Sequence, residues 1–542
     1  VKVNKLIVKG GNVRVKGEIE SIEKGGELGT VYIIKETGAV IPNGIPTGFV
    51  VVDPVAYDMQ MAFAEGGEYV LTADASIIGA NITVPANKTV TLDLNGHTIT
   101  AANKEGDNIM ILGSMTLRDS SNDAIGKIVA NNDYTNSYST TLIYISGENA
   151  SMTMESGNIY AVRQNSVDNG QFGVGVYDGG DFTMTGGKIE AGWYAVAGNG
   201  NYKTQNSVIK IEGGELISTA DYAVYLPQAG TTTISGGKIN GAAGGVAMQN
   251  GTLNISGNAQ ILSTDEGNTG NWSDGTGGLG NAALVINAGY GDCVVNITGG
   301  TISALKKAAL IDTPNTEYER TIKISGGTFS DPSAFAYLTE SAKVNVSLKT
   351  DQTCNGFITR DGQTVDINLN SHTLTFTERT VGSLGTETNN CQLLKGSKVT
   401  FRDGTMQSEN TEIVIQNYCQ LLLQNVKVIA EKADYVVSNN NGSCTITNST
   451  LTAGNCAFDV YSFSSYEGVE VTVNEGSIIN GNVEFGGDNG KQNGKLIING
   501  GTFNGDLKVT EKYYNTSEPN IIINGGDFGE HKGWSDYQKG AQ

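Results

Sequence analysis

A short phrase with two adjacent glycines recurs along this chain of 542 residues and limits what the chain can fold into. It reads MTGGKI at 184, IEGGEL at 211, ISGGKI at 234, ITGGTI at 297, ISGGTF at 324, INGGTF at 498 and INGGDF at 523. Degenerate copies, such as ISGNAQI at 255 and VNEGSI at 473, bring most of the spacings to about 25 residues. A period in this range is typical of solenoids and other arrays of stacked units.

Each repeat has the pattern of two strands joined at a corner. Apolar and polar residues alternate around the glycines, as in TMTGGKIEA, and this is the period of a half-buried strand. The Gly-Gly or Asn-Gly pair supplies the positive φ that a tight corner needs. No stretch has a convincing helical period. The sequence therefore predicts an all-β chain that forms a parallel β-helix, with an array of β-sandwiches as the alternative.

A longer phrase occurs twice and divides the chain. TVTLDLNGHTIT at residues 89–100 returns as TVDINLNSHTLT at residues 364–375. Downstream, GSMTLRDS matches GSKVTFRDG, which aligns Arg118 and Asp119 with Arg402 and Asp403. We therefore predict two tandem duplicated β-helix blocks, at 59–333 and 334–542, after a small N-terminal β domain at 1–58.

The duplicated phrase contains His97 and His372, two of the three histidines of the chain. A catalytic histidine needs a nucleophile or an orienting carboxylate, and we expect that partner to be duplicated with it. The nearest candidate is not duplicated, because Asp93 in the first copy corresponds to Asn368 in the second. We therefore interpret both histidines as turn residues that hold a corner. The same interpretation makes each Arg-Asp pair a corner salt bridge.

The duplicated phrase and the ISGGxI corners resemble right-handed β-helix proteins of the pectate-lyase-like superfamily. They look most like the non-catalytic repeat modules of gut-bacterial surface proteins and of phage fibres and tailspikes. The resemblance covers roughly residues 60 to 530 and implies a right-handed parallel β-helix. It implies less about function, since lyases, hydrolases and binding proteins share that fold.

Composition excludes some classes of partner. The formal net charge of −21 argues against nucleic acid, because phosphate binding requires a basic surface. No run of eighteen apolar residues occurs, so no membrane insertion is expected. The six cysteines have no CxxC spacing and no histidine beside them, which disfavours a zinc site. Most are expected to be small buried residues, and one or two disulfides are an open alternative.

The sequence contains little that points to catalysis, and we predict no catalytic residue. Polysaccharide lyases of this fold use clustered acids for Ca²⁺, and the densest candidate here is Asp178 with Asp181 in VYDGGDFTM. Two carboxylates on either side of a Gly-Gly corner point in unrelated directions, so we expect no metal site, although Ca²⁺ is the ion they would suit. No G-x-S-x-G elbow, HExxH motif or phosphate loop occurs.

Aromatic residues give the strongest indication of binding. Trp193, Tyr194, Tyr222 and Tyr225 fall in comparable places of successive repeats, and Trp272 lies in the long loop STDEGNTGNWSDGTGGLGN at 263–281. Exposed aromatic rings stack on sugars and form contact surfaces at low entropic cost. A ladder of aromatic rings buried inside the fold is the alternative.

The leading hypothesis is a non-enzymatic β-helix rod, displayed on a virion as a fibre or appendage, that contacts a bacterial surface glycan or cell-surface receptor. The first 58 residues differ from the repeat and resemble an attachment domain for other virion or surface proteins. No signal peptide or sorting element is recognisable, which favours the virion over the alternative of a secreted or surface-bound bacterial adhesin. A polysaccharide lyase or depolymerase is the alternative from another class. No cofactor is expected, and assembly as a homotrimer is left open.

Overall fold

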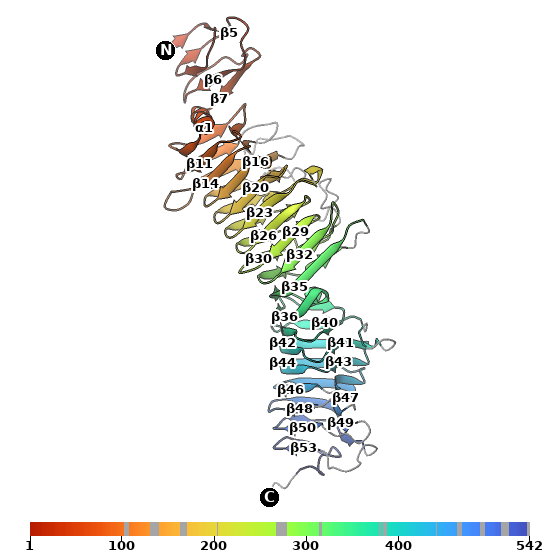
Figure 1. Ribbon diagram of the computed structural model, residues 1–542. Helices are drawn as coiled ribbons and strands as arrows, with labels where there is room; N and C mark the ends of the chain where they lie inside the picture. Colours follow the sequence, from red (N-terminus) through yellow and green to blue (C-terminus); the bar gives the residue numbers. More distant parts are fainter. Residues whose placement is uncertain are drawn as a thin grey trace. The chain divides into compact units, whose positions relative to one another are not determined.

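The computed structural model describes residues 1–101, 108–130, 140–162, 171–202, 204–266, 279–313, 317–378, 381–382, 387–440, 442–462, 469–487, 494–510 and 520–538. Strands dominate these ranges, and the strands pair in long parallel sheets (Figure 1). The prediction of an all-β chain is therefore confirmed. The chain divides into a first compact unit, residues 1–296 with 311–321, and a second compact unit, residues 297–310 with 322–542.

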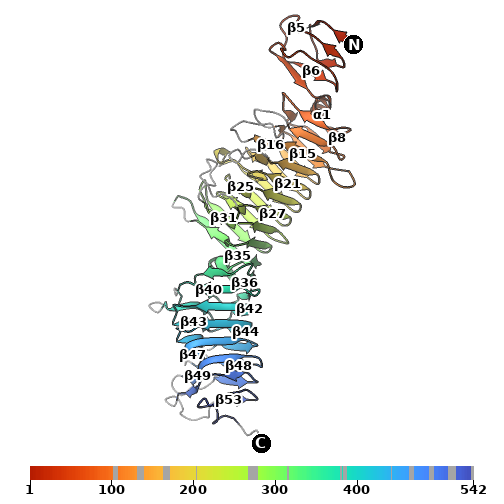
Figure 2. The same cartoon turned by 180° about the vertical axis from the view of Figure 1, so that it is seen from behind.

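Three parallel ladders make up most of the first compact unit, and each repeat adds one strand to each ladder. The first ladder contains β8 (Gly67–Val70), β11 (Thr89–Asp93), β14 (Ser114–Arg118), β17 (Ser151–Met154), β20 (Asp181–Met184), β23 (Ser207–Ile211), β26 (Gly230–Ile234) and β29 (Gly251–Ile255). The second contains β9 (Ala75–Ile77), β12 (Thr98–Ala101), β15 (Lys127–Ala130), β18 (Asn158–Ala161), β21 (Lys188–Ala191), β24 (Glu215–Ser218), β27 (Lys238–Gly241) and β30 (Gln260–Ser263) (Figure 2). The third contains β10 (Ile82–Val84), β13 (Ile109–Ile111), β16 (Thr140–Ser146), β19 (Gln171–Tyr177), β22 (Val196–Ala197), β25 (Tyr222–Leu226), β28 (Gly244–Met248) and β31 (Ala282–Ile286). This arrangement is consistent with a parallel β-helix or solenoid.

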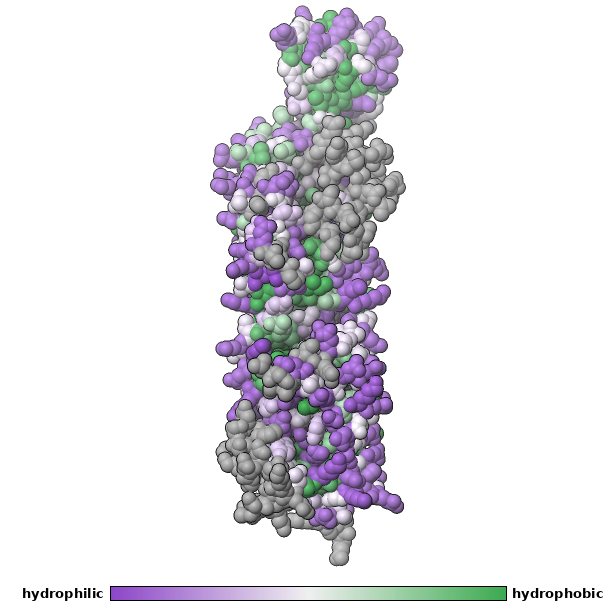
Figure 3. Space-filling model, turned by 90° about the vertical axis from the view of Figure 1, so that its right-hand side faces the viewer, coloured by the Kyte–Doolittle hydropathy of each residue, from purple (hydrophilic) through white to green (hydrophobic). Residues whose placement is uncertain are grey.

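The core of the first unit is a set of apolar columns that run through the ladders. In the first ladder Leu92, Leu117, Met154, Met184 and Ile211 are successive register partners, and all are 0% exposed. The residues between them point the other way and are half-buried. The alternation read from the sequence is therefore the alternation between core and surface. Hydrophilic side chains predominate on the face shown in Figure 3, with hydrophobic patches between them.

The two glycines of the repeated phrase serve different purposes at the corner between the first and second ladders. Gly187 has a φ of +82°, in the left-handed region that L residues rarely adopt. A Cβ on Gly186 would lie against the carbonyl oxygen of Glu155, which belongs to the preceding repeat. The first glycine therefore permits close stacking of neighbouring repeats, and the second permits the turn.

Residues 1–52, here called the N-terminal segment, are also built from parallel strands. The pairs are β1 (Lys2–Val3) with β4 (Glu18–Ile19), β2 (Leu6–Val8) with β5 (Ile22–Lys24), and β3 (Val13–Val15) with β6 (Val31–Lys35), which also pairs with β7 (Phe49–Val52). The segment has its own apolar cluster around Ile33, which is 0% exposed. It therefore folds as strands, and the phrase VKGGNV at 8–13 joins β2 to β3 through a glycine pair of the same form, with Gly11 at a φ of +73°.

Helix α1 (Pro54–Glu65) follows the N-terminal segment and corrects the expectation that no stretch is helical. The side chain of Asp53 accepts hydrogen bonds from the backbone N–H groups of Val55 and Ala56, both at 3.0 Å, and Pro54 begins the helix. Ala56, Met59 and Phe63 form its buried face. The Asp-Pro pair is a recognisable helix start, and the predicted boundary between residues 58 and 59 falls inside this helix.

Four strands lie in the stretch where the chain passes between the two compact units, and all of them but β33 span a point of division. They are β32 (Cys293–Ile297), β33 (Thr301–Ala304), β34 (Ala308–Asp312) and β35 (Arg320–Phe329). Two 3₁₀ helices occur in the described ranges, η1 (Gly200–Tyr202) and η2 (Pro332–Tyr337). Helix η2 begins with Asp331 and Pro332, so each copy of the duplicated phrase follows a helical turn that starts with Asp-Pro.

The second compact unit is also built from parallel ladders, and several of its strands are longer than those of the first unit. Its strands are β36 (Leu338–Ser347), β37 (Gln352–Cys354), β38 (Phe357–Thr359), β39 (Thr364–Asn368), β40 (Thr373–Phe376), β41 (Asn389–Leu393), β42 (Lys398–Ser408), β43 (Ile413–Asn417), β44 (Gln420–Ala430), β45 (Tyr435–Asn439), β46 (Ser443–Thr447), β47 (Thr450–Ser462), β48 (Glu470–Val473), β49 (Ile478–Gly487), β50 (Lys495–Ile498), β51 (Thr502–Phe503), β52 (Leu507–Val509) and β53 (Asn520–Ile523). Strand β42 pairs with both β39 and β40, so one strand continues through a corner and serves two ladders. Ile367, Phe401 and Leu423 form an inner column that is 0% exposed.

Candidate functional site

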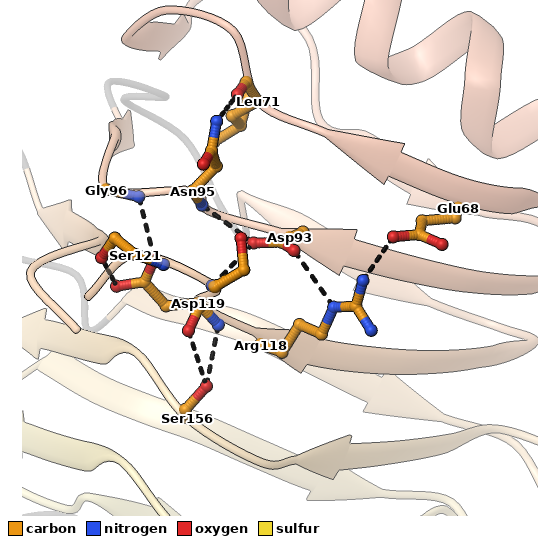
Figure 4. Close-up of polar contacts among 10 residues, drawn as sticks. Glu68, Leu71, Asp93, Asn95, Gly96, Arg118, Asp119, Ser121 and Ser156 are labelled. Carbon is orange, nitrogen blue, oxygen red and sulfur yellow. Dashed lines mark hydrogen bonds and ion pairs between the residues drawn. The ribbon is translucent and has the colours of Figure 1, made fainter. Parts of the chain in front are cut away.

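The first copy of the duplicated phrase forms a tight corner between β11 and β12 (Figure 4). The backbone N–H of His97 donates to the carbonyl oxygen of Leu94 at 2.8 Å and closes the turn. Asn95 Nδ2 donates to the carbonyl oxygen of Leu71, one repeat earlier, at 3.0 Å. Asp93 Oδ1 accepts the backbone N–H of Asn95 at 2.9 Å. The corner is therefore tied both to itself and to the preceding repeat.

The second copy reproduces these bonds. His372 N–H donates to the Leu369 carbonyl at 2.8 Å, and Asn370 Nδ2 donates to the Leu348 carbonyl at 3.2 Å. Asn368 Oδ1 accepts the N–H of Asn370 at 2.9 Å, as Asp93 Oδ1 does for Asn95. This turn bond needs only an acceptor oxygen, so a carboxylate and an amide can exchange here.

Each histidine of the duplicated phrase has a carboxylate neighbour from the preceding repeat. His97 Nδ1 lies 3.5 Å from Asp74 Oδ1, and His372 Nδ1 lies 3.6 Å from Asp351 Oδ1. The same carboxylate oxygens accept the backbone N–H of Thr98 and Thr373, both at 2.8 Å. The carboxylate partner is thus duplicated, but it lies about 20 residues before the histidine and not at Asp93.

The third histidine of the chain has the same surroundings. His531 Nδ1 lies 3.6 Å from Asp506 Oδ1, which accepts the backbone N–H of Lys532 at 2.9 Å. That N–H is the main reason why the pKa of Asp506 lies below its usual value. All three histidine side chains are about one-third exposed. The shared element is an aspartate that holds the backbone beyond the corner, with the imidazole beside it.

Arg118 and Asp119 have separate partners in the first copy (Figure 4). Arg118 forms ion pairs with Glu68 and with Asp93, whose Oδ2 lies 3.1 Å from Nε. Asp119 accepts the backbone N–H groups of Gly96 at 2.8 Å and of Gly126 at 2.6 Å. The predicted role at a corner fits both residues, but each acts with other partners and not with its neighbour.

The carboxylate of Asp93 is the most buried of this group, with the residue 2% exposed. Burial raises the pKa of Asp93, but the backbone N–H donors of Ser120 and Asn95, together with Arg118, outweigh it, so the pKa lies below its usual value. In the second copy Arg402 pairs with Asp366 at 2.9 Å and with Asp403 at 3.2 Å. The neighbouring Arg and Asp therefore form an ion pair with each other in the second copy, between Arg402 and Asp403, but not in the first.

The aromatic residues proposed from the sequence as a binding stripe are buried. Trp193, Tyr194, Tyr222 and Tyr225 are 8%, 1%, 1% and 4% exposed and form one cluster. The rings of Tyr194 and Tyr225 stack with their centroids 4.9 Å apart. No face of these rings is open to a sugar, so they match the alternative of a buried aromatic ladder. Trp272 lies outside the described residues.

Asp178 and Asp181 lie on either side of a turn between β19 and β20. Asp178 has a φ of +52°, and Asp181 Oδ1 accepts the backbone N–H of Val208 at 3.1 Å in the next repeat. Over the ranges that the structure describes, no three His, Cys, Asp or Glu side chains gather into a group that could hold a metal ion. Asp181 therefore helps to hold β20 to the next repeat.

All six cysteines are free thiols, and five of them are buried. Cys354 is half-buried. Burial raises the pKa of Cys293 and of Cys419 to about 12, so these thiols stay protonated at neutral pH. The expectation that most cysteines are small buried residues is confirmed.

One pair of carboxylates was missed by sequence reasoning. Asp459 on β47 and Glu484 on β49 are register partners in the second unit. Asp459 accepts from Ser438 Oγ at 3.1 Å and from the backbone N–H of Asn439, while Tyr435 donates to Glu484 at 2.6 Å. Burial raises the pKa of Asp459 to about 7, against the hydrogen bonds that it accepts. No local motif signals this pair, because its members come from different repeats.

Comparison with known proteins assigns the chain to no family. No protein-family model matches it, and neither a curated protein nor a solved structure does. In the described part of the chain, none of the helices has both the length and the apolar character needed to cross a membrane. The fold class and the side-chain contacts described above are therefore the basis for a function.

Proposed function

We propose that the chain is a right-handed parallel β-helix in two tandem duplicated blocks, related to the pectate-lyase-like superfamily, with a small N-terminal β domain. It acts as a non-enzymatic scaffold, displayed on a virion as a fibre or appendage, that contacts bacterial surface glycan. Parallel ladders that gain one strand per repeat, and the glycine corners between them, support the fold assignment.

The observation that carries the scaffold role is the use of charge in the duplicated corner. Asp93 joins Asn95 and Arg118, and Asp119 joins Gly96 and Gly126, so these carboxylates hold neighbouring repeats together. Asp74 and Asp351 do the same for the backbone beyond each histidine. Carboxylates whose contacts are to the backbone and to ion-pair partners suit a stable scaffold better than a reaction site.

A polysaccharide panel tests this proposal. Purified protein is incubated with capsular and cell-wall polysaccharides of candidate hosts, with and without EDTA, and binding is measured by affinity electrophoresis. Cleavage is followed through new reducing ends and through the absorbance of unsaturated uronates. We expect retardation by at least one polysaccharide in both conditions, without cleavage. Neighbouring genes test the setting: capsid and tail genes fit a virion, whereas surface-glycan genes fit a bacterial adhesin.

A second candidate, a polysaccharide hydrolase, is favoured by the pairing of Asp459 with Glu484. Register partners on adjacent parallel strands lie about 4.8 Å apart, close to the roughly 5 to 5.5 Å between the carboxyl groups of retaining glycosidases. A carboxyl group with a pKa of about 7 can donate and accept protons near neutrality. Hydrolysis by the parent that is lost in Glu484→Gln, but kept in the exposed control Glu475→Gln, would establish this second function.

A further inference from the structure

An open pocket of about 840 Å³ lies within the second compact unit. Its walls come from the turn before β34, the start of η2, and strands β37 and β38. This volume is in the range of about 300 to 1,000 Å³ that small-molecule and oligosaccharide-sized ligands occupy. None of its lining residues is one of the corner residues or the carboxylate pair described above, and no local motif in the sequence marks the pocket.

The charged residues of this pocket are mainly basic in a chain that is strongly acidic. The chain carries 56 acidic and 35 basic residues, yet Lys306, Lys307 and Arg360 all line the pocket. All three are exposed residues. Three cationic side chains therefore line one concave surface of a molecule whose net charge is −21, and such a grouping favours an anionic ligand.

The single acid among the lining residues is withdrawn from the opening. Asp331 is 5% exposed, and its carboxylate accepts the backbone N–H groups of Ala309 at 2.6 Å and of Ser333 at 2.7 Å. These bonds cap η2 and hold the carboxylate in the wall of the pocket. The Asp331 carboxylate is therefore bound to the wall of the pocket, and its oxygens do not face a ligand in the opening.

The remaining lining residues supply hydrogen bonds and an apolar wall. Thr353, Asn355 and Thr377 are exposed, and Thr377 Oγ1 donates to Asn355 Oδ1 at 3.2 Å. The rings of Phe335 and Phe357 meet edge to face, 4.8 Å apart between centroids, and are nearly buried. An apolar wall behind charged groups lowers the local dielectric constant and strengthens their attraction for an anion.

We infer that this pocket binds an acidic glycan, with Lys306, Lys307 and Arg360 contacting its anionic groups and the Thr and Asn side chains its hydroxyl groups. The guanidinium of Arg360 offers paired donors that match the oxygens of a carboxylate, sulfate or phosphate, and each lysine adds a point charge. Amide and hydroxyl side chains are suited to sugar hydroxyls, because they donate and accept in one place. The inference rests on the proposed glycan-binding function and adds the site and the chemical class of the ligand.

The test compares a pocket variant with a charge-matched control. The pocket variant is Lys306→Gln/Lys307→Gln/Arg360→Gln. The control is Lys343→Gln/Lys427→Gln/Lys432→Gln, which removes the same charge from exposed positions outside the pocket. Binding to hyaluronate oligosaccharides (carboxylate), dextran sulfate (sulfate) and neutral dextran is measured by calorimetry at low and at physiological salt. Melting temperatures of both variants show whether they remain folded.

We expect the parent to bind hyaluronate, dextran sulfate or both, and to bind neutral dextran more weakly. The pocket variant should lose about tenfold in affinity because three partly screened ion pairs are removed, whereas the control should match the parent. Equal affinity of the pocket variant and the control, or equal binding of neutral dextran, would overturn the inference. If the folded pocket variant loses acidic glycans but still binds the host polysaccharides of the panel, the pocket is confirmed as one of several contacts. If the parent binds no polysaccharide at all, the proposed function itself fails.

Discussion

The Nδ1 atom of His97 lies 3.5 Å from Oδ1 of Asp74, a residue of the preceding repeat, and the same relationship recurs at His372 and His531. In each case the aspartate also accepts the backbone N–H of the residue after the histidine, at 2.8 or 2.9 Å. The backbone bond is the shorter contact. Stability should therefore depend more on the aspartate than on the histidine.

Substitutions at this corner test whether the aspartate contributes more to stability than the histidine. Asp74→Ala removes the acceptor for the Thr98 N–H and should lower the free energy of unfolding by about 1 kcal/mol. His97→Ala removes a contact that is longer and one-third exposed, so its effect should be smaller. Urea titrations of both variants measure the difference. A larger loss in His97→Ala than in Asp74→Ala would mean that the imidazole holds the corner.

Asp93 and Asn368 occupy matching places, but the structure predicts unequal effects of removing them. Asp93→Ala breaks bonds to Asn95, Ser120 and Arg118 at a buried site and should cost roughly 2 to 3 kcal/mol. Asn368→Ala breaks one turn bond at a half-buried site and should cost about 1 kcal/mol. Thermal melts of the two variants compare them. Equal losses would show that the bond from Ser120 and the ion pair with Arg118 together add nothing to the stability of the first corner.

The glycine pair at a corner should tolerate no side chain. Gly186→Ala would press a methyl group against the carbonyl oxygen of Glu155, and Gly187→Ala would place alanine at a φ of +82°. Each should lower the free energy of unfolding by roughly 2 kcal/mol. Gly29→Ala is the control, because no atom lies within 4 Å of its added Cβ and its φ is not positive. Melting temperatures that fall equally in all three variants would contradict the packing argument.

Asp459 should make stability depend on pH below neutrality. Its pKa is raised to about 7 in the folded state, so between about pH 4 and 7 the folded state binds more protons than the unfolded state. Stability should consequently fall as pH rises through this window. Asp459→Asn keeps an acceptor for the Asn439 N–H without the charge, and should raise stability at pH 7.5 by an amount on the order of a few kcal/mol. The advantage should vanish near pH 4; an advantage that is the same at both pH values would exclude this titration.

The strands and the glycine corners could be predicted from the sequence, because each depends on only a few neighbouring residues. Alternation around Gly186 and Gly187 gave the strands and the corner, because side-chain period and positive φ are properties of a few adjacent residues. Helix α1 was predictable from Asp53 and Pro54, but an apolar face of only three buried residues is too short to give a clear helical period.

The contacts that form the site were beyond such patterns. Asp74 lies 23 residues before His97 (97 − 74), and Glu484 lies 25 residues after Asp459 (484 − 459), so stacking of repeats brings each pair together. The pocket likewise joins the turn at Lys306 to Arg360, more than 50 residues later. Tyrosine is amphipathic, so composition alone did not decide whether Tyr194 and Tyr222 were exposed or buried.

The central claim is that the chain binds bacterial surface glycan without cutting it, and one experiment measures both properties. Purified protein is mixed with a size-fractionated surface polysaccharide from a candidate host, and the mixture is run on size-exclusion chromatography with light scattering, before and after overnight incubation. We predict that the protein co-elutes with the polysaccharide and that protease digestion then releases polymer of its original mass. A polymer whose mass falls with incubation time, or a protein that never co-elutes with any acidic or neutral host polysaccharide, would contradict the account.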